Sequence, residues 1–176
     1  MSSRIHWPAA LALLAAAALV ACNAAGQRGS GEAADLEPPV AFDTGTVHIQ
    51  TATDTFVVKV ELAETDEQRS YGLMERRQLA ENAGMLFVYG ALQDAEYGFW
   101  MYRTLIPLDI AFADEDGRIV AIRQMVPCRS PNPQVCPIYA PGHPYLTALE
   151  VNADYFEKRG IGVGDRIVLL PRGAAN

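Results

Sequence analysis

The sequence predicts a mainly β domain, an antiparallel β-sandwich or small barrel that carries two short helices. Two observations lead to this prediction. About eight short segments rich in β-branched and aromatic residues follow one another between turn residues. The two segments with helical signals are too short to cover both faces of a parallel sheet, so we expect the strands to be mainly antiparallel.

The predicted strands are spread along the chain, at residues 46–50, 55–62, 84–89, 97–102, 108–113, 118–126, 146–151 and 166–170. Residues 52–54 separate the first two, a spacing typical of a hairpin. Residues 115–117 separate the fifth and sixth, and Gly117 tolerates the positive φ of a tight turn. Antiparallel hairpins are therefore expected at both places.

Both helices are predicted from the residues that begin and end them. Thr65 and Gln68 have the spacing of a capping box, which opens the first helix. Asn152 is the expected N-cap of the second helix, basic residues occupy its last turn, and Gly160 ends it.

The N-terminus is typical of an export signal. Arg4 precedes an unbroken apolar run at residues 9–21, which is too short to span a bilayer. The run ends at Cys22 and resembles a bacterial lipoprotein processing site, in which this cysteine receives the lipid; the alternative is an ordinary cleaved signal with an incidental cysteine. Asn23 in place of an aspartate favours the outer membrane over the inner one.

These features divide the chain into four parts. We expect a signal peptide at 1–21, a lipidated N-terminus and flexible tether at 22–45, one folded domain at 46–171 and a short tail at 172–176. The predicted location is the bacterial cell envelope, with the domain anchored through Cys22 and facing the periplasm.

The charge balance argues against nucleic-acid binding. The chain has 14 Lys and Arg against 21 Asp and Glu, a net charge of −7. Such an acidic chain is poorly suited to contact phosphate backbones. Its length of 176 residues also excludes a large multi-domain enzyme.

Two further cysteines, Cys128 and Cys136, lie in a proline-rich loop. In an exported protein this pair predicts a structural disulfide, with a redox-active pair and a metal pair as the alternatives. The loop at 127–145 also carries tyrosines and a histidine, so a protein-interaction surface is a third possibility for it.

Several motifs in the folded part together resemble one protein family, the Domain of Unknown Function family 192. The motifs are Arg69-x-x-Gly72-Leu73-Met74-x-Arg76, Gly84-Met85-Leu86-Phe87-Val88, Phe99-Trp100-Met101-x-x-Thr104-Leu105-Ile106-Pro107-Leu108-Asp109 and Leu149-Glu150-Val151-Asn152. The resemblance covers about residues 55–170. It implies a compact, mainly β domain of jelly-roll type that is often exported and has no established activity. The family usually has Asn where this chain has Arg103. Any role of the asparagine side-chain amide is therefore lost in this chain, or is taken over by the arginine charge.

The charged residues within these motifs need partners because apolar residues surround them. Asp109 and Glu150 lie in predicted strands, and Arg69 and Arg76 are two helical turns apart if their helix continues that far. One interpretation is arginine–carboxylate pairing that fixes the helix to the sheet. A second is a binding cleft in which the arginines bind anions and the carboxylates accept hydrogen bonds. A third is acid–base hydrolysis by Asp109 and Glu150.

The sequence favours a non-catalytic envelope module that binds a small molecule or glycan. Trp100 and Tyr102 share one face of a predicted strand and could stack on a ring, with Arg103 beside them. The alternatives are an envelope hydrolase that uses Asp109 and Glu150, and a protein-interaction module that uses residues 127–145. No metal-ligand pattern, phosphate loop or nucleophile motif is present, so we predict no metal site and no cofactor.

Overall fold

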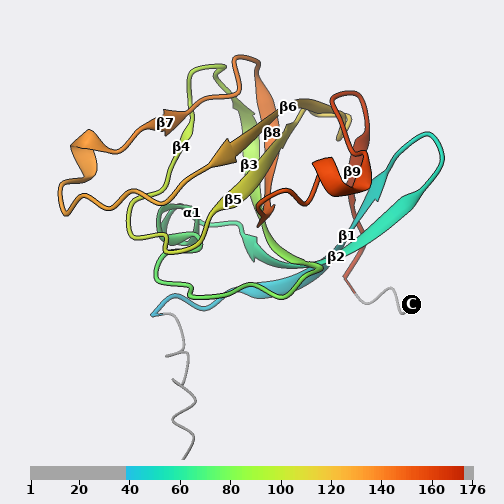
Figure 1. Cartoon of the computed structure of the whole chain (residues 1–176). Coiled ribbons are helices and arrows are strands. Elements are labelled where there is room, and N and C mark those ends of the chain that lie inside the picture. The colour runs from blue at the N-terminus through green and yellow to red at the C-terminus, as the bar shows by residue number, and fades with distance from the viewer. Residues whose placement is uncertain (1–38, 173–176) are drawn as a thin grey trace, which may run out of the picture. The chain divides into compact units, whose positions relative to one another are not determined.

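The computed structural model describes residues 39–172, which form one curled sheet of seven strands and a smaller two-stranded sheet (Figure 1). The large sheet has the strand order β6-β5-β8-β3-β2-β1-β9, and the small sheet pairs β4 with β7. The strands are β1 Asp43–Gln50, β2 Thr55–Ala63, β3 Ala83–Gln93, β4 Phe99–Trp100, β5 Leu108–Ala113, β6 Ile119–Met125, β7 Ile138–Tyr139, β8 Tyr145–Asn152 and β9 Arg166–Leu169. The mainly β prediction is confirmed.

Neighbouring strands run antiparallel with one exception. β2 and β3 are parallel, with Val60 opposite Gly84. A parallel pair needs a crossover connection, and the segment between the two strands contains the only α-helix of the described residues, α1 (Asp66–Tyr71). The predicted capping box is formed: the Thr65 hydroxyl accepts from the Gln68 N–H, and the Gln68 side chain accepts from the Thr65 N–H.

The sheet curls until its two edge strands meet at one end. The Ile167 N–H donates to the Gly117 carbonyl at 2.8 Å, and the Ile119 N–H donates to the Asp165 carbonyl at 2.8 Å. These bonds partly close the sheet into a barrel. Ile119 and Ile167, from the two edges, belong to one buried cluster, which therefore lies inside the curl.

A second buried cluster covers the outer face of β3, β5 and β8. Phe87, Ile110 and Phe112 contribute from the sheet, while Leu73 and Phe99 cover them from segments outside it. β5 is buried along its whole length because one of its faces contacts the inner cluster and the other contacts the outer cluster. The candidate site lies where the outer cluster reaches the surface.

Several elements differ from the sequence prediction. β3 continues to Gln93, β7 was not predicted, and β4 contains only Phe99 and Trp100, so the expectation that Tyr102 shares a strand with Trp100 is wrong. β1 begins at Asp43 rather than at Thr46, so the regular structure starts within the expected tether. The expected second helix is a turn followed by the 3₁₀ segment η2 (Glu157–Arg159), which Gly160 ends in the left-handed conformation. The expected signal at 1–21 and the lipid acceptor Cys22 lie outside the described residues. Within residues 39–172, no helix has the length and apolar character needed to cross a membrane.

Candidate functional site

A recess opens beside α1, above the outer face of β3 and β8. It consists of a cavity of about 350 Å³ and a cavity of about 20 Å³ whose linings share Arg69, Ser70, Phe99 and Trp100. Tyr89 and Tyr97 line the larger cavity, and Tyr102, Thr104 and Glu150 line the smaller one. Four of the residues predicted as binding residues, Arg69, Trp100, Tyr102 and Glu150, therefore come together here.

Aromatic side chains form much of the wall of the recess. Tyr89 packs edge-to-face against Tyr97, with ring centroids 6.2 Å apart. The Trp100 and Tyr102 rings are 5.5 Å apart and tilted by 41°. Trp100 is 40% exposed, so one part of its indole remains available to a ligand.

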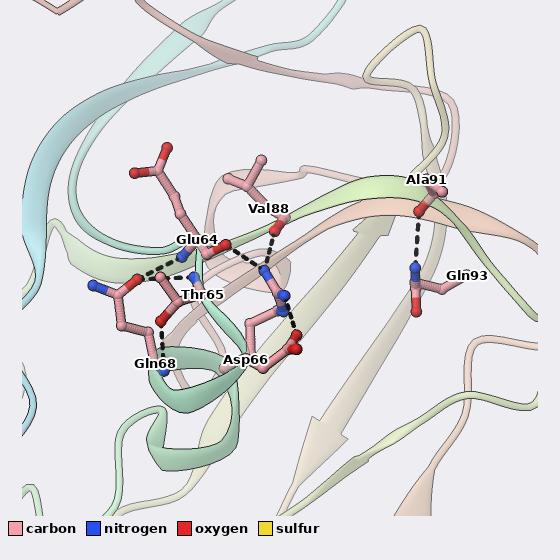
Figure 2. A network of polar contacts seen from close by, with 8 residues as sticks. Glu64, Thr65, Asp66, Gln68, Val88, Ala91 and Gln93 are labelled. Carbon is pink, nitrogen blue, oxygen red and sulfur yellow. Dashed lines mark hydrogen bonds and ion pairs between the residues drawn. The ribbon is translucent and has the colours of Figure 1, made fainter.

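Arg69 fixes α1 to the sheet. Its guanidinium donates to the Glu64 carbonyl at 2.7 Å and to the Val88 carbonyl at 2.8 Å, and it forms an ion pair with Asp66. Figure 2 draws these three contacts as dashed lines from Glu64, Asp66 and Val88; the Arg69 side chain that they share carries no label there. The guanidinium also lies 5.0 Å from the centre of the Tyr89 ring. These contacts occupy the charge, so the expected role of Arg69 as an anion binder is not favoured.

Glu150 lies at the inner end of the recess with its side chain on the outer face of β8. Its neighbours in register are Met85 on β3 and Ile110 on β5, both apolar. The residue is 4% exposed, and within residues 39–172 no hydrogen bond or neighbouring charge contributes to the pKa of its carboxyl. Burial raises the pKa of Glu150 to about 8, so the carboxyl is mostly protonated at pH 7.

Asp109 lies on the other face of the sheet, so the predicted catalytic pair is not formed. Its partner in β8 is Val151, whereas Glu150 is paired with Ile110. The backbone N–H groups of residues 154–156 approach the Asp109 carboxyl and lower its pKa, but burial outweighs them and leaves the pKa raised. Two carboxyls on opposite faces cannot flank one glycosidic bond, and the proposed hydrolase geometry is wrong.

Arg76 also lies outside the recess. α1 ends at Tyr71, so Arg69 and Arg76 do not share the face of one helix. Arg76 pairs with Glu61 of β2 through contacts of 2.7 and 2.8 Å, and not with Asp109 or Glu150 as expected. Arg76 and Glu61 line a larger, open cavity of about 1060 Å³.

A family model covers most of this domain. The model of DUF192, described as an uncharacterised family, matches residues 47–169. The chain belongs to the DUF192 family. The search of curated proteins finds no match.

Two solved structures are similar to this DUF192 domain. A candidate transcription regulator from Sinorhizobium meliloti is 35% identical, with a TM-score of 0.66 over 75% of this chain and 98% of that chain. A protein of unknown function from Novosphingobium aromaticivorans is 30% identical, with a TM-score of 0.64 over 81% of this chain and 99% of that chain. Both support the curled, mainly β fold.

The departure from the family pattern at Arg103 has a local structural explanation. Arg103 has a φ of 58°, in the left-handed region that asparagine tolerates better than most residues. Its guanidinium pairs with Glu75, which itself has a φ of 63°. The Glu75 N–H also donates to the Arg103 carbonyl at 2.8 Å. Arg103 is therefore engaged in a surface turn next to Tyr102 rather than in the recess.

The loop at 127–145 contains the predicted disulfide between Cys128 and Cys136. β7, within this loop, pairs with β4 and places Ile138 opposite Trp100. The disulfide therefore lies in the segment that supports the outer wall of the recess. Within residues 39–172, no group of three or more His, Cys, Asp or Glu side chains is arranged to hold a metal ion.

Tyr89 and Tyr97 line the recess but were not among the residues predicted to form a site. Tyr89 follows Phe87 by two residues in β3, so strand alternation gave a signal that both side chains lie on one face. Tyr97 lies just before β4, and nothing in its local pattern indicated that it would reach Tyr89.

Proposed function

We propose that this DUF192 protein is an exported, lipid-anchored and non-catalytic binding module whose recess takes a small molecule or sugar with a flat ring face. The aromatic lining of the 350 Å³ cavity, with the half-exposed Trp100 at its edge, carries the proposal. Cavities of this size and lining are typical of sites for small ligands. Ring stacking on a rigid aromatic side chain loses little conformational entropy.

The arrangement of charges supports binding rather than hydrolysis. Glu150 stands at the recess without a second carboxyl beside it, because Asp109 is on the other face. The nearest arginine, Arg69, is held by three partners of its own chain. Acid–base cleavage of a glycosidic bond needs two carboxyl groups on either side of that bond.

The proposed location depends on residues 1–45 and on the disulfide. A short apolar run that ends at Cys22 supports lipid anchoring, and a disulfide between Cys128 and Cys136 fits an oxidising compartment. The net charge of −7 argues against nucleic-acid binding, so we do not transfer the description of the Sinorhizobium protein to this chain.

A protein-interaction module is a second candidate because the loop at 127–145 exposes apolar side chains. Val135 is 64% exposed and Ile138 is 59% exposed. A partner protein could cover these side chains together with Trp100.

The test uses ligand-detected NMR to measure which compounds of a panel of monosaccharides and small aromatic molecules bind to the purified protein. We expect at least one ring compound to bind, and we expect Trp100→Ala to weaken its binding at least tenfold. Val163→Ala, which removes another exposed apolar side chain away from the recess, should leave binding unchanged. Equal binding by the wild type and Trp100→Ala would contradict the proposed site.

A further inference from the structure

The Glu150 carboxyl is buried without a partner at the end of a cavity. The residue is 4% exposed and lines the small cavity, and burial is the only cause of its raised pKa, with no hydrogen bond or neighbouring charge contributing. A buried carboxyl without a hydrogen bond or a nearby cation destabilises the folded state, particularly when the carboxyl is charged. A ligand that supplied the missing cation would therefore gain a strong interaction here.

The space next to Glu150 has the size of a single polar group. The smaller cavity has a volume of about 20 Å³, enough for one water molecule or one ammonium group. Phe87, Phe99, Trp100 and Tyr102 line it together with Thr104. Aromatic faces attract cations, and a threonine hydroxyl can accept a hydrogen bond from an ammonium group.

We propose that the recess selects ligands with a primary ammonium group, which enters the small cavity and pairs with Glu150 while the ring of the ligand occupies the larger cavity. This inference rests on the proposed function and names the chemical class of its ligand. Phe99 and Trp100 line both cavities, so the two are adjacent, and the proposed binding mode requires the ammonium group to pass these rings.

The pairing is coupled to a proton. Because burial raises the pKa of Glu150 to about 8, the free protein at neutral pH holds a proton on this carboxyl. When an ammonium group binds, the carboxyl releases this proton to solvent and becomes the negatively charged partner. Below pH 8, affinity should therefore rise about tenfold per pH unit, with release of one proton per ligand.

Other ionisable groups near Glu150 do not supply its counter-charge. Arg69 on α1 already contacts Asp66 and two backbone carbonyls. Arg76 is paired with Glu61, which lies two strands away from Glu150 in the same cross-strand row.

The other ionisable groups at this face are tyrosines: Tyr71, Tyr89, Tyr97 and Tyr102 line the recess, and Tyr145 of β8 packs against Tyr89. Asp109 of β5 points to the opposite face of the sheet, and Glu67 of α1 is exposed. Burial raises the pKa of Tyr89 to about 12, so it stays neutral over the pH range of the test. Burial also raises the pKa of Tyr145.

The experiment compares ligands that differ only in charge. The full-length protein is titrated calorimetrically with two ligand pairs, benzylamine with benzyl alcohol and glucosamine with glucose. Each titration is carried out at pH 6 and at pH 7, in two buffers of different ionisation enthalpy. We expect at least one amine to bind at least tenfold more tightly than its alcohol partner at pH 7. That amine should bind about tenfold more tightly at pH 7 than at pH 6 and release one proton.

The matched variant is Glu150→Gln, which keeps the shape of the side chain and removes its titration. It should lose the preference for the amine and the pH dependence, while its binding of the neutral partner stays within about threefold of the wild type. Retention of the preference in Glu150→Gln would overturn the inference. A second measurement, the ¹³C NMR titration of the Glu150 carboxyl, should show a lower apparent pKa in saturating amine.

The outcomes separate this inference from the proposed function. Equal, pH-independent binding of amine and neutral partner, both weakened by Trp100→Ala, would overturn the ammonium inference and leave the ring-binding function standing. If none of the four compounds binds, the ammonium inference is overturned. Failure of the wider ring panel as well would overturn the proposed function.

Discussion

Asp109 and Glu150 lie on the adjacent strands β5 and β8 but point to opposite faces of the sheet. Asp109 is opposite Val151, and Glu150 is opposite Ile110. Strand alternation then places Glu150 in the outer cluster, at the recess, and Asp109 against the turn at 154–156. The two buried carboxyls therefore have separate environments and should have separable effects.

Glu150→Gln should change how stability depends on pH. The pKa of Glu150 is about 8 in the folded protein, above its ordinary value of 4.5, so the folded state holds a proton that the unfolded state has already lost. The contribution of Glu150 to stability is present below about pH 4.5 and is lost as the pH rises towards 8, by about 1.4 kcal/mol per pH unit. We expect Glu150→Gln to remove this slope and to be more stable than the wild type at pH 8.

Urea unfolding at pH 5, 6, 7 and 8 measures this difference. Glu96→Gln, which changes an exposed glutamate, is the control and should follow the wild-type profile. A Glu150→Gln profile parallel to that of the wild type would contradict the raised pKa.

Removal of the disulfide should destabilise the outer wall of the recess. The bond closes a loop between residues eight apart, Cys128 and Cys136, and its loss should lower the free energy of unfolding by about 2–3 kcal/mol. The double variant Cys128→Ser, Cys136→Ser should also weaken ligand binding, since β7 supports Trp100. Thermal denaturation of the oxidised, reduced and double-serine proteins checks this. Identical unfolding of all three would show that the bond contributes nothing.

The ion pair between Arg76 and Glu61 should matter more than an ordinary surface pair. Both side chains are less than one-third exposed, at 24% and 28%, and the two contacts are 2.7 and 2.8 Å. Arg76→Met leaves the Glu61 carboxylate half-buried and should cost about 1–3 kcal/mol. The double variant with Glu61→Gln should recover part of this loss, and a double-mutant cycle in urea measures the coupling. Additive effects would contradict a direct interaction.

Position 103 offers a test of backbone strain. Arg103 has a φ of 58°, and its pairing with Glu75 offsets the cost of this conformation. Arg103→Asn should melt at a higher temperature than Arg103→Ala, because asparagine tolerates the left-handed region and alanine does not. Differential scanning calorimetry of the two variants decides the order, and a higher melting temperature for the alanine variant would contradict the role assigned to φ.

Local features of the fold could be predicted from the sequence. The capping box at Thr65 and Gln68, the strands on either side of Gly117 and the disulfide are encoded by residues that are close along the chain. The parallel pairing of β2 with β3 could not be predicted, because it depends on the path of the crossover rather than on any local pattern. The same holds for the contact between the edge strands β6 and β9.

The recess could be predicted only in part. Arg69, Trp100 and Glu150 were identified from the motifs. Because they are far apart along the chain, the sequence did not show that all three lie at the recess on the outer face of the sheet. Strand alternation puts Asp109 on the face opposite Ile110, but only the register of β5 with β8 shows that Glu150 lies on the same face as Ile110. Tyr97 was expected in a strand at 97–102, but the observed strand begins at Phe99, so strand alternation could not indicate its contact with Tyr89.

The central claim is that the aromatic recess, and not the larger cavity beside β1 and β2, is the binding site. Chemical-shift mapping of the isotope-labelled protein with a ligand from the ring panel tests it most directly. We expect the largest shifts at Arg69, Tyr97 and Trp100, which line the recess. Shifts confined to Thr46, Lys59 and Arg76, which line the larger cavity, would contradict the account.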